Sequence, residues 1–178
     1  MAQLAIGRMI LPMAAWAARH AVQGSGNALA VIAPGGAALR AALEESGCEI
    51  LESEATARGL GASLAAGVAH SRDAEGWVVA LGDMPFIEAA TFRSVVEALL
   101  AGAPIAAPVF RPTSARGHPV GFAKSLREEL LALDGDEGAR SVVERHKDRV
   151  VSIPVDDRGI VVDIDTPDDF DAAAQAQL

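Results

Sequence analysis

Apolar runs of strand length alternate with longer segments of helical period along most of the chain. This alternation is typical of β-α crossover units, which build a sheet of parallel strands and cover it with helices. The run 77–81 is apolar at every position, as expected of a parallel strand that helices cover on both faces. The sequence therefore predicts an α/β fold with a mostly parallel sheet.

The same alternation places the individual elements. Expected strands cover 28–33, 48–52, 77–81, 105–110, 119–122, 149–154 and 160–164. Expected helices cover 13–23, 37–46, 61–70, 88–100, 126–132, 139–146 and a terminal segment from 167. No internal repeat, low-complexity tract or linker divides the chain, so we expect one domain over residues 1–178.

Charge and composition exclude several classes of function. The 24 acidic and 15 basic residues give a formal charge of −9, and no basic patch stands out that could follow a nucleic-acid backbone. No apolar run approaches the roughly 20 residues that span a bilayer, and the first twenty residues match a secretory signal peptide poorly. The single cysteine, Cys48, suits a reducing compartment. We therefore expect a cytoplasmic protein that binds neither nucleic acid nor membrane.

Acidic side chains follow two of the apolar runs, where parallel sheets bind their ligands. Asp83 follows the run 78–82, in which Gly82 would let a ligand approach the backbone; alternatively, Asp83 only caps the turn. Asp163 and Asp165 lie two residues apart at the end of the last expected strand, so they point to one face. Adjacent carboxylates repel each other unless a cation neutralises them, and such oxygen ligands suit magnesium. The alternative is an exposed strand end before a capped helix, which leaves these two acids unexplained.

Several motifs, taken in order and spacing, point to a known family. They are Leu81-Gly-Asp-Met-Pro-Phe86, Arg116-Gly-His-Pro-Val120, Gly135-Asp-Glu-Gly-Ala-Arg140, and Pro154-Val-Asp-Asp157 followed by Asp163-Ile-Asp-Thr-Pro-Asp168. Together they resemble the molybdenum cofactor cytidylyltransferases, within the MobA-like NTP transferases, over residues 20–175. The resemblance implies a three-layer, Rossmann-like nucleotidyltransferase fold and a magnesium-dependent enzyme. Its reaction would transfer CMP from CTP to molybdopterin and release pyrophosphate.

The resemblance also implies roles for particular residues. Asp83 and Asp165 would hold the magnesium and carry catalysis, with Asp163 as their neighbour. The remaining implied ligand contacts are Gly59, Gly61 and Ser63 to the nucleotide, Gly82 beside it, Arg116 and His118 toward the acceptor, and Arg140 to the pterin phosphate. Three alternatives stay open: the glycines only pack the start of a helix, the histidine is structural, and the acids near Arg140 only balance a helix dipole.

The front of the chain departs from the family pattern. Members begin with Leu-Ala-Ala-Gly-x-Ser-x-Arg-Met-Gly-x-x-Lys, whereas here only 4–5 and 7–9 match and the first lysine is Lys124. We therefore expect the first strand to be lost or shortened, through a late start codon, an internal deletion or a degenerate protein. This leaves two alternatives: a related nucleotidyltransferase that uses GTP or another acceptor, and a non-catalytic molybdopterin-binding relative. A maturation protein of a molybdenum enzyme is a further expected partner.

Overall fold

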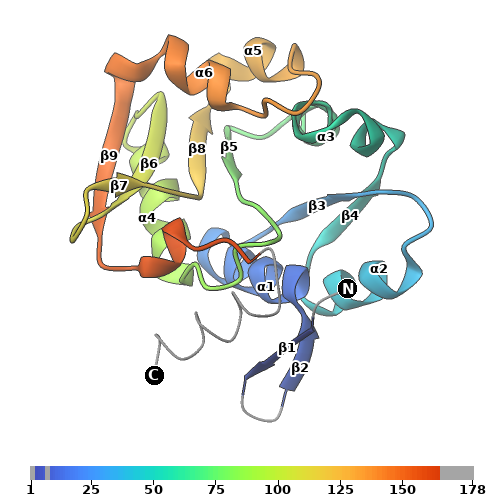
Figure 1. Ribbon diagram of the computed structural model, residues 1–178. Coiled ribbons are helices and arrows are strands. Elements are labelled where there is room, and N and C mark those ends of the chain that lie inside the picture. The colour runs from blue at the N-terminus through green and yellow to red at the C-terminus, as the bar shows by residue number, and fades with distance from the viewer. Residues whose placement is uncertain (1–2, 7–8, 165–178) are drawn as a thin grey trace.

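The computed structural model describes residues 3–6 and 9–164, with side chains from residue 13 onward (Figure 1). The strands are β1 (Gln3–Ile6), β2 (Met9–Pro12), β3 (Leu29–Ile32), β4 (Glu49–Glu52), β5 (Gly76–Val79), β6 (Ile105–Phe110), β7 (Ala115–Arg116), β8 (Val120–Ala123) and β9 (Val150–Val155). The α-helices are α1 (Met13–Ser25), α2 (Ala37–Glu45), α3 (Leu60–His70), α4 (Ala89–Leu100), α5 (Arg127–Leu131) and α6 (Arg140–Arg145). Short 3-10 helices are η1 (Glu54–Arg58), η2 (Lys124–Leu126), η3 (Lys147–Arg149) and η4 (Arg158–Val161). None of the described helices is long and apolar enough to cross a membrane.

The described strands form one five-stranded sheet, a parallel pair and a hairpin. β3 and β4 pair in parallel, as two strands joined by the helix α2 should. The larger sheet has the order β5-β8-β6-β7, with β9 parallel to β6. β1 is four residues long and pairs antiparallel with β2, and within the described residues it joins neither of the other two sheets. The α/β class is thus confirmed, with parallel and antiparallel pairs mixed.

The direction of β5 differs from the expectation for a central parallel strand. β5 pairs antiparallel with β8, and the described residues contain no second strand partner for it. Its apolar run is explained instead by helices on both faces, because Trp77 packs toward Val68 of α3 while Val78 packs toward Val95 of α4. Apolar periodicity reports burial of the two faces and carries no information on strand direction.

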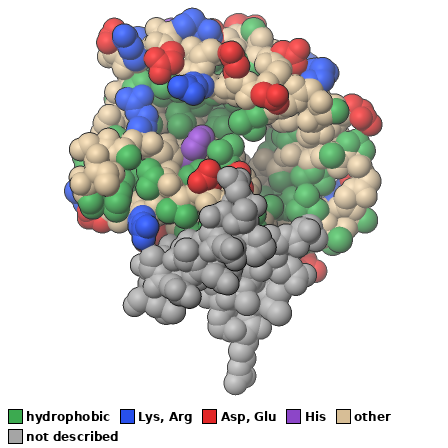
Figure 2. Space-filling model, in the orientation of Figure 1, with side chains coloured by type: hydrophobic (Ala, Val, Ile, Leu, Met, Phe, Trp, Pro, Cys, Tyr) green, Lys and Arg blue, Asp and Glu red, His purple; other side chains and the backbone are tan. Residues whose placement is uncertain are grey.

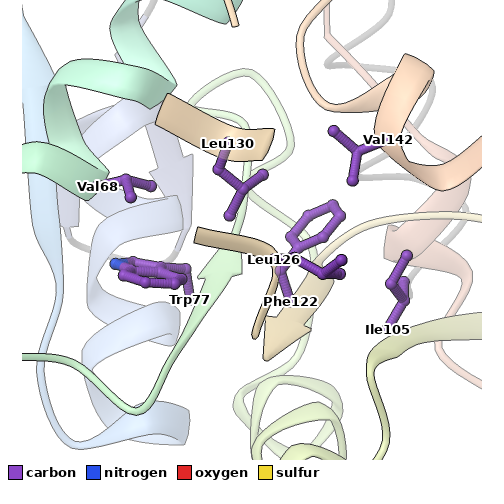
Figure 3. Packing of buried hydrophobic residues seen from close by; sticks show 7 residues of the cluster. All are labelled: Val68, Trp77, Ile105, Phe122, Leu126, Leu130 and Val142. Atoms are coloured by element: carbon purple, nitrogen blue, oxygen red, sulfur yellow. The ribbon is translucent and has the colours of Figure 1, made fainter. Parts of the chain in front are cut away.

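Two helical layers sandwich the larger sheet. One face contacts α3, α5 and α6 through a cluster that Figure 3 shows at close range: Val68, Trp77, Ile105, Phe122, Leu126, Leu130 and Val142. Successive residues of β6 point to opposite faces, so Ile105 joins this cluster while Ala106 packs under α4. Full burial of a side chain such as Phe122 contributes about 1.5–3 kcal/mol. The three-layer arrangement that was expected is therefore present.

The predicted strand at 160–164 is wrong. Arg158–Val161 form η4, and the chain continues to Ile164 without strand pairing. Gly159 lies so close to the Phe86 carbonyl that an added Cβ would be 2.2 Å from its oxygen. The backbone groups of Ile160 and Ile164 bond to two loops instead of to a neighbouring strand. The expected terminal helix from 167 lies outside the described residues.

Candidate functional site

Asp83 lies in a tightly anchored turn after β5. Met84, Phe86 and Ile87, which follow it, are each 5% exposed or less. Gly82 lies beside α1, and a Cβ there would make an ordinary contact of 3.4 Å with the Cβ of Ala14. The residues after Asp83 are thus packed into the core, and α4 begins at Ala89, within one residue of the expected start at 88. The Oδ1 atom of Asp83 is buried and has no hydrogen-bond partner in the described part of the chain.

His118 lies in the loop between β7 and β8. The amide of Gly117 donates to the carbonyl of Pro108 over 3.0 Å, and this places His118 at the start of β8. Burial lowers the pKa of His118, while a backbone hydrogen bond with Val79 and the charge of Asp83 act in the opposite direction. The Nδ1 atom of His118 is also buried without a hydrogen-bond partner among the described residues. A buried imidazole with a lowered pKa is uncharged at neutral pH.

Residues 160–164 form a strap that joins the two loops. The carbonyl of Ile160 accepts from the amide of His118, and the amide of Ile164 donates to the carbonyl of Asp83, each over 3.0 Å. These two hydrogen bonds fix the Asp83 and His118 backbones relative to one strap. Ile164 is buried, whereas the preceding Asp163 is exposed. The alternation expected around Asp163 is present although the strand is not.

The metal site that was predicted is partly within the described residues. Asp83 and Asp163 lie on segments whose backbones are hydrogen-bonded, whereas Asp165 lies outside the described residues. Within the described ranges, no three His, Cys, Asp or Glu side chains converge on a point that would hold an ion. The buried free Oδ1 of Asp83 nevertheless fits a divalent cation, because an unpartnered buried carboxylate oxygen costs free energy that a cation would recover.

A second group gathers around the start of α3. Gly59 has a φ of +112°, and an added Cβ would lie 2.2 Å from the Oδ1 of Asp136. The amide of Gly61 donates to the carbonyl of Gly135 over 2.7 Å. The hydroxyl of Ser63 donates to the carbonyl of Gly59 over 2.9 Å. The glycines thus pack the helix start closely, against the loop at 134–136 instead of the sheet, and the Gly61 amide is already used.

The loop before α6 carries the other predicted phosphate contact. Arg58 bonds to Asp134 over 3.1 Å and lowers the pKa of that carboxyl. Arg140 is the first residue of α6 and is exposed. Arg116 is exposed on β7, opposite Val109 of β6. The structure therefore brings Gly59, Gly61, Ser63 and the loop before Arg140 together, and Asp83 with His118.

Asp157 is a buried carboxylate whose structural role sequence reasoning missed. It is 7% exposed, and its Oδ2 accepts from the amide of Glu88 over 2.8 Å and from the hydroxyl of Thr91 over 2.6 Å. Its Oδ1 accepts from the amide of Gly159 over 2.8 Å. One carboxylate thus joins the segment after β9 to the start of α4. The two adjacent aspartates at the end of the motif 154–157 were the only hint of this role in the sequence. The sequence does not reveal which of the two is buried.

The face of the molecule in Figure 2 is hollowed at its centre. A histidine and acidic side chains lie beside the hollow, and several Lys or Arg side chains lie around it. A second, open pocket lies elsewhere, and acids make up four of its eight lining residues: Glu128, Glu129, Asp134 and Glu137, beside Ala132, Leu133, Ser141 and Arg145. Because phosphates avoid a wall of carboxylates, the second cavity does not suit a nucleotide.

Comparisons with known proteins agree with this fold. Residues 4–150 match the family model of the MobA-like NTP transferase domain. No curated protein matches the chain. The crystal structure of Rv0371c from Mycobacterium tuberculosis is 26% identical, covers 97% of this chain and 87% of its own, and has a TM-score of 0.79. Its manganese complex is 24% identical over 97% of this chain and 90% of its own, with a TM-score of 0.77.

A third similar structure carries an activity in its name. A cytidylyltransferase from Leptospira borgpetersenii is 18% identical, covers 96% of this chain and 76% of its own, and has a TM-score of 0.73. At this level of identity the likeness concerns the fold.

Proposed function

The chain belongs to the MobA-like NTP transferase family, and we propose that it is a molybdenum cofactor cytidylyltransferase acting on CTP and molybdopterin. A phosphate oxygen of molybdopterin would attack the α-phosphorus of CTP, the bond to the β-phosphate oxygen would break, and pyrophosphate would leave. The observation that carries the proposal is the Oδ1 of Asp83, buried without a protein partner in a fixed turn after β5. The family motifs around Asp83, His118 and Arg140 support the choice of acceptor.

The chain's own residues divide the work of such a reaction. Asp83 would hold magnesium, with Asp163 and Asp165 as the further carboxylates. A divalent cation, when bound, neutralises negative charge on the phosphates. The strap at 160–164 hydrogen-bonds to Asp83 and to His118. These bonds would restrict motion between the two loops and so preserve the geometry that catalysis needs.

The other predicted residues would bind and orient the two substrates. Gly82, next to Asp83 and exposed, would leave room for the nucleotide, and Arg116 and His118 would face the acceptor. Arg140 would bind the pterin phosphate as an exposed, charged donor. The start of α3, with Gly59, Gly61 and Ser63, would contact the nucleotide through groups other than the Gly61 amide. A cytoplasmic setting and a maturation protein as partner belong to the same proposal.

Thermal melting tests nucleotide binding and its dependence on Asp83. At a CTP concentration of 100 times the dissociation constant, with magnesium, binding stabilises the fold by about 2.7 kcal/mol. We expect a raised melting temperature with CTP in the natural protein and none in Asp83→Ala. Asp156→Ala removes an exposed acid and is the matched control, which should respond like the natural protein. GTP is run beside CTP, because a shift with GTP alone would favour a related nucleotidyltransferase.

Turnover tests the reaction itself. Pyrophosphate release should require CTP, magnesium and molybdopterin together, and Asp83→Ala should abolish it. Retained turnover in Asp83→Ala would contradict the role of this carboxylate. Binding of molybdopterin by a folded protein that shows no nucleotide response would favour the non-catalytic relative.

A further inference from the structure

Two segments of the candidate site lie side by side and run in opposite directions. One is the turn after β5 that begins with Asp83, and the other follows β9 and includes the strap. The amide of Ile164 donates to the carbonyl of Asp83 over 3.0 Å. At the other end of the pair, the amide of Glu88 donates to the Oδ2 of Asp157 over 2.8 Å. Hydrogen bonds therefore join the two segments at both ends.

The middle parts of the two segments are closely packed. A Cβ on Gly159 would lie 2.2 Å from the oxygen of Phe86 and 2.7 Å from the nitrogen of Ile87. Ile160 packs in one buried cluster with Ile87. Ile164 packs in another with Phe86. Neither segment is a strand, so this packing and the hydrogen bonds at the two ends set the register between them.

Asp157 is the side chain that joins both segments to α4. Besides the amide of Glu88, it accepts from the amide of Gly159 over 2.8 Å and from the hydroxyl of Thr91 over 2.6 Å. Among the described residues it is the only charged one in the buried class, at 7% exposure. A buried charge costs free energy that its three donors must offset, and those donors come from three separate places in the chain. The carboxylate therefore fixes the relative positions of its donors.

We propose that Asp157 is a positioning residue for the cation site: it holds the strap in register with the turn after β5 and so sets where Asp83 presents its carboxylate. This inference rests on the proposed function, in which Asp83 holds the divalent cation. The carbonyl of Ile160, in the strap, also accepts from the amide of His118, so a shift of the strap would disturb both loops of the site. Asp157 is assigned no contact with cation or substrate.

Hydrogen exchange of the ¹⁵N-labelled natural protein, followed by NMR, is the first test. If Asp157 holds the two segments together, the amides of Glu88, Gly159 and Ile164 open in one event, and their protection factors should agree within about tenfold. Protection of Ile164 that is more than about a hundredfold weaker than that of the other two would overturn the inference, because the strap would then open while Asp157 stays bonded. This measurement needs no variant, so it decides the question even if variants of Asp157 fail to fold.

Asp157→Asn weakens the contact with little change in size. The new NH2 group must face the amide of Glu88 or that of Gly159, and both of these are donors. We expect exchange of the Ile164 amide to become at least about tenfold faster relative to the slowest core amides, which report global unfolding. The dissociation constant of Mn²⁺ should rise by about tenfold or more. Mn²⁺ alone is the probe, since the electron paramagnetic resonance signal of the free ion weakens on binding.

Two control variants separate positioning from loss of stability. Thr91→Val removes one bond of Asp157 on the side of α4 and leaves the amides of both segments with their acceptors. It should destabilise the fold but leave the relative exchange of Ile164 and the Mn²⁺ affinity unchanged, at a temperature where every variant is folded. Asp156→Asn makes the same chemical change at the exposed neighbour and should behave like the natural protein.

The outcomes distinguish the inference from the proposed function. If the natural protein and Asp157→Asn bind Mn²⁺ equally well, the inference is refuted and the transferase proposal stands. Weaker Mn²⁺ binding in Thr91→Val as well would also overturn the inference, because loss of stability would then explain both variants. If the natural protein binds no Mn²⁺, the cation role of Asp83 fails and the inference fails with it. Faster exchange of Ile164 together with weaker Mn²⁺ binding in Asp157→Asn alone supports the inference.

Discussion

Replacement of Asp157 by alanine should destabilise the protein strongly. The carboxylate accepts three hydrogen bonds, from the amides of Glu88 and Gly159 and from the hydroxyl of Thr91. Hydrogen bonds to charged groups contribute about 1.5–3 kcal/mol each, but such contributions do not add fully, and water can reach the exposed Glu88. We therefore expect the free energy of unfolding to fall by about 3–5 kcal/mol.

Urea unfolding, followed by tryptophan fluorescence, measures this loss. Trp77 is buried in the main core cluster, so its emission reports the transition. For a domain of this size, each kcal/mol shifts the melting temperature by about 2–4 °C, so thermal melting should show a drop of roughly 6–20 °C. Asp157→Asn keeps the shape but turns an amide N–H toward one donor, so its loss should be smaller.

The neighbouring aspartate provides the control. Asp156 is exposed and pairs with Arg111 on the surface, so Asp156→Ala should cost less than about 1 kcal/mol. A loss below about 1 kcal/mol for Asp157→Ala, or equal losses for the two variants, would refute the view that Asp157 ties β9 to α4.

Two further predictions concern the strap and its contact with His118. Gly117→Ala should cost about 1–3 kcal/mol and several degrees in melting temperature, because the Cβ would meet the Ile160 carbonyl. Gly36→Ala has no neighbour nearer than 3.9 Å and should cost less, about 0.5–1 kcal/mol, because Gly36 is the N-cap of α2, where alanine is less favourable than glycine. Stability of the metal-free protein should fall as the pH drops below about 6.5, because the unfolded chain takes up a proton at His118 that the folded protein resists. Above that pH His118 is uncharged in both states, so its contribution is complete there. Urea titrations from pH 8 to pH 5 should show a weaker dependence in His118→Gln, and identical slopes in both proteins would contradict the role of its burial.

Local pattern predicted the type and order of most elements. The segments 37–46, 105–110 and 149–154 were expected as a helix and two strands, and α2, β6 and β9 confirm them within one residue at either end. These predictions succeed because apolar periodicity records which faces of a segment are buried. The expectation that the first strand is lost or shortened stays a prediction, because the described β1 has four residues, as β3, β4, β5 and β8 have.

Long-range contacts decided the features that periodicity does not record. The segment 160–164 is apolar enough for a strand, yet its backbone bonds to His118 and Asp83, which lie more than forty residues earlier in the chain. The direction of β5 is likewise set by its partner β8. A parallel strand, an antiparallel strand and an unpaired extended segment can all have the same local pattern of apolar residues. Only the segment to which the backbone hydrogen-bonds distinguishes them.

The candidate site divides in the same way. The sequence by itself determined that an acid follows β5 and that a Gly-His-Pro segment precedes β8, since these are fixed by residue order. Only the tertiary structure decided that the backbones of Asp83 and His118 bond to the same segment at 160–164. It also decided that Asp157 and not Asp156 is buried, and that the Gly61 amide is bonded to Gly135. The burial of a side chain and its hydrogen-bond partners depend on which segments meet in space. Packing of the whole core brings those segments together.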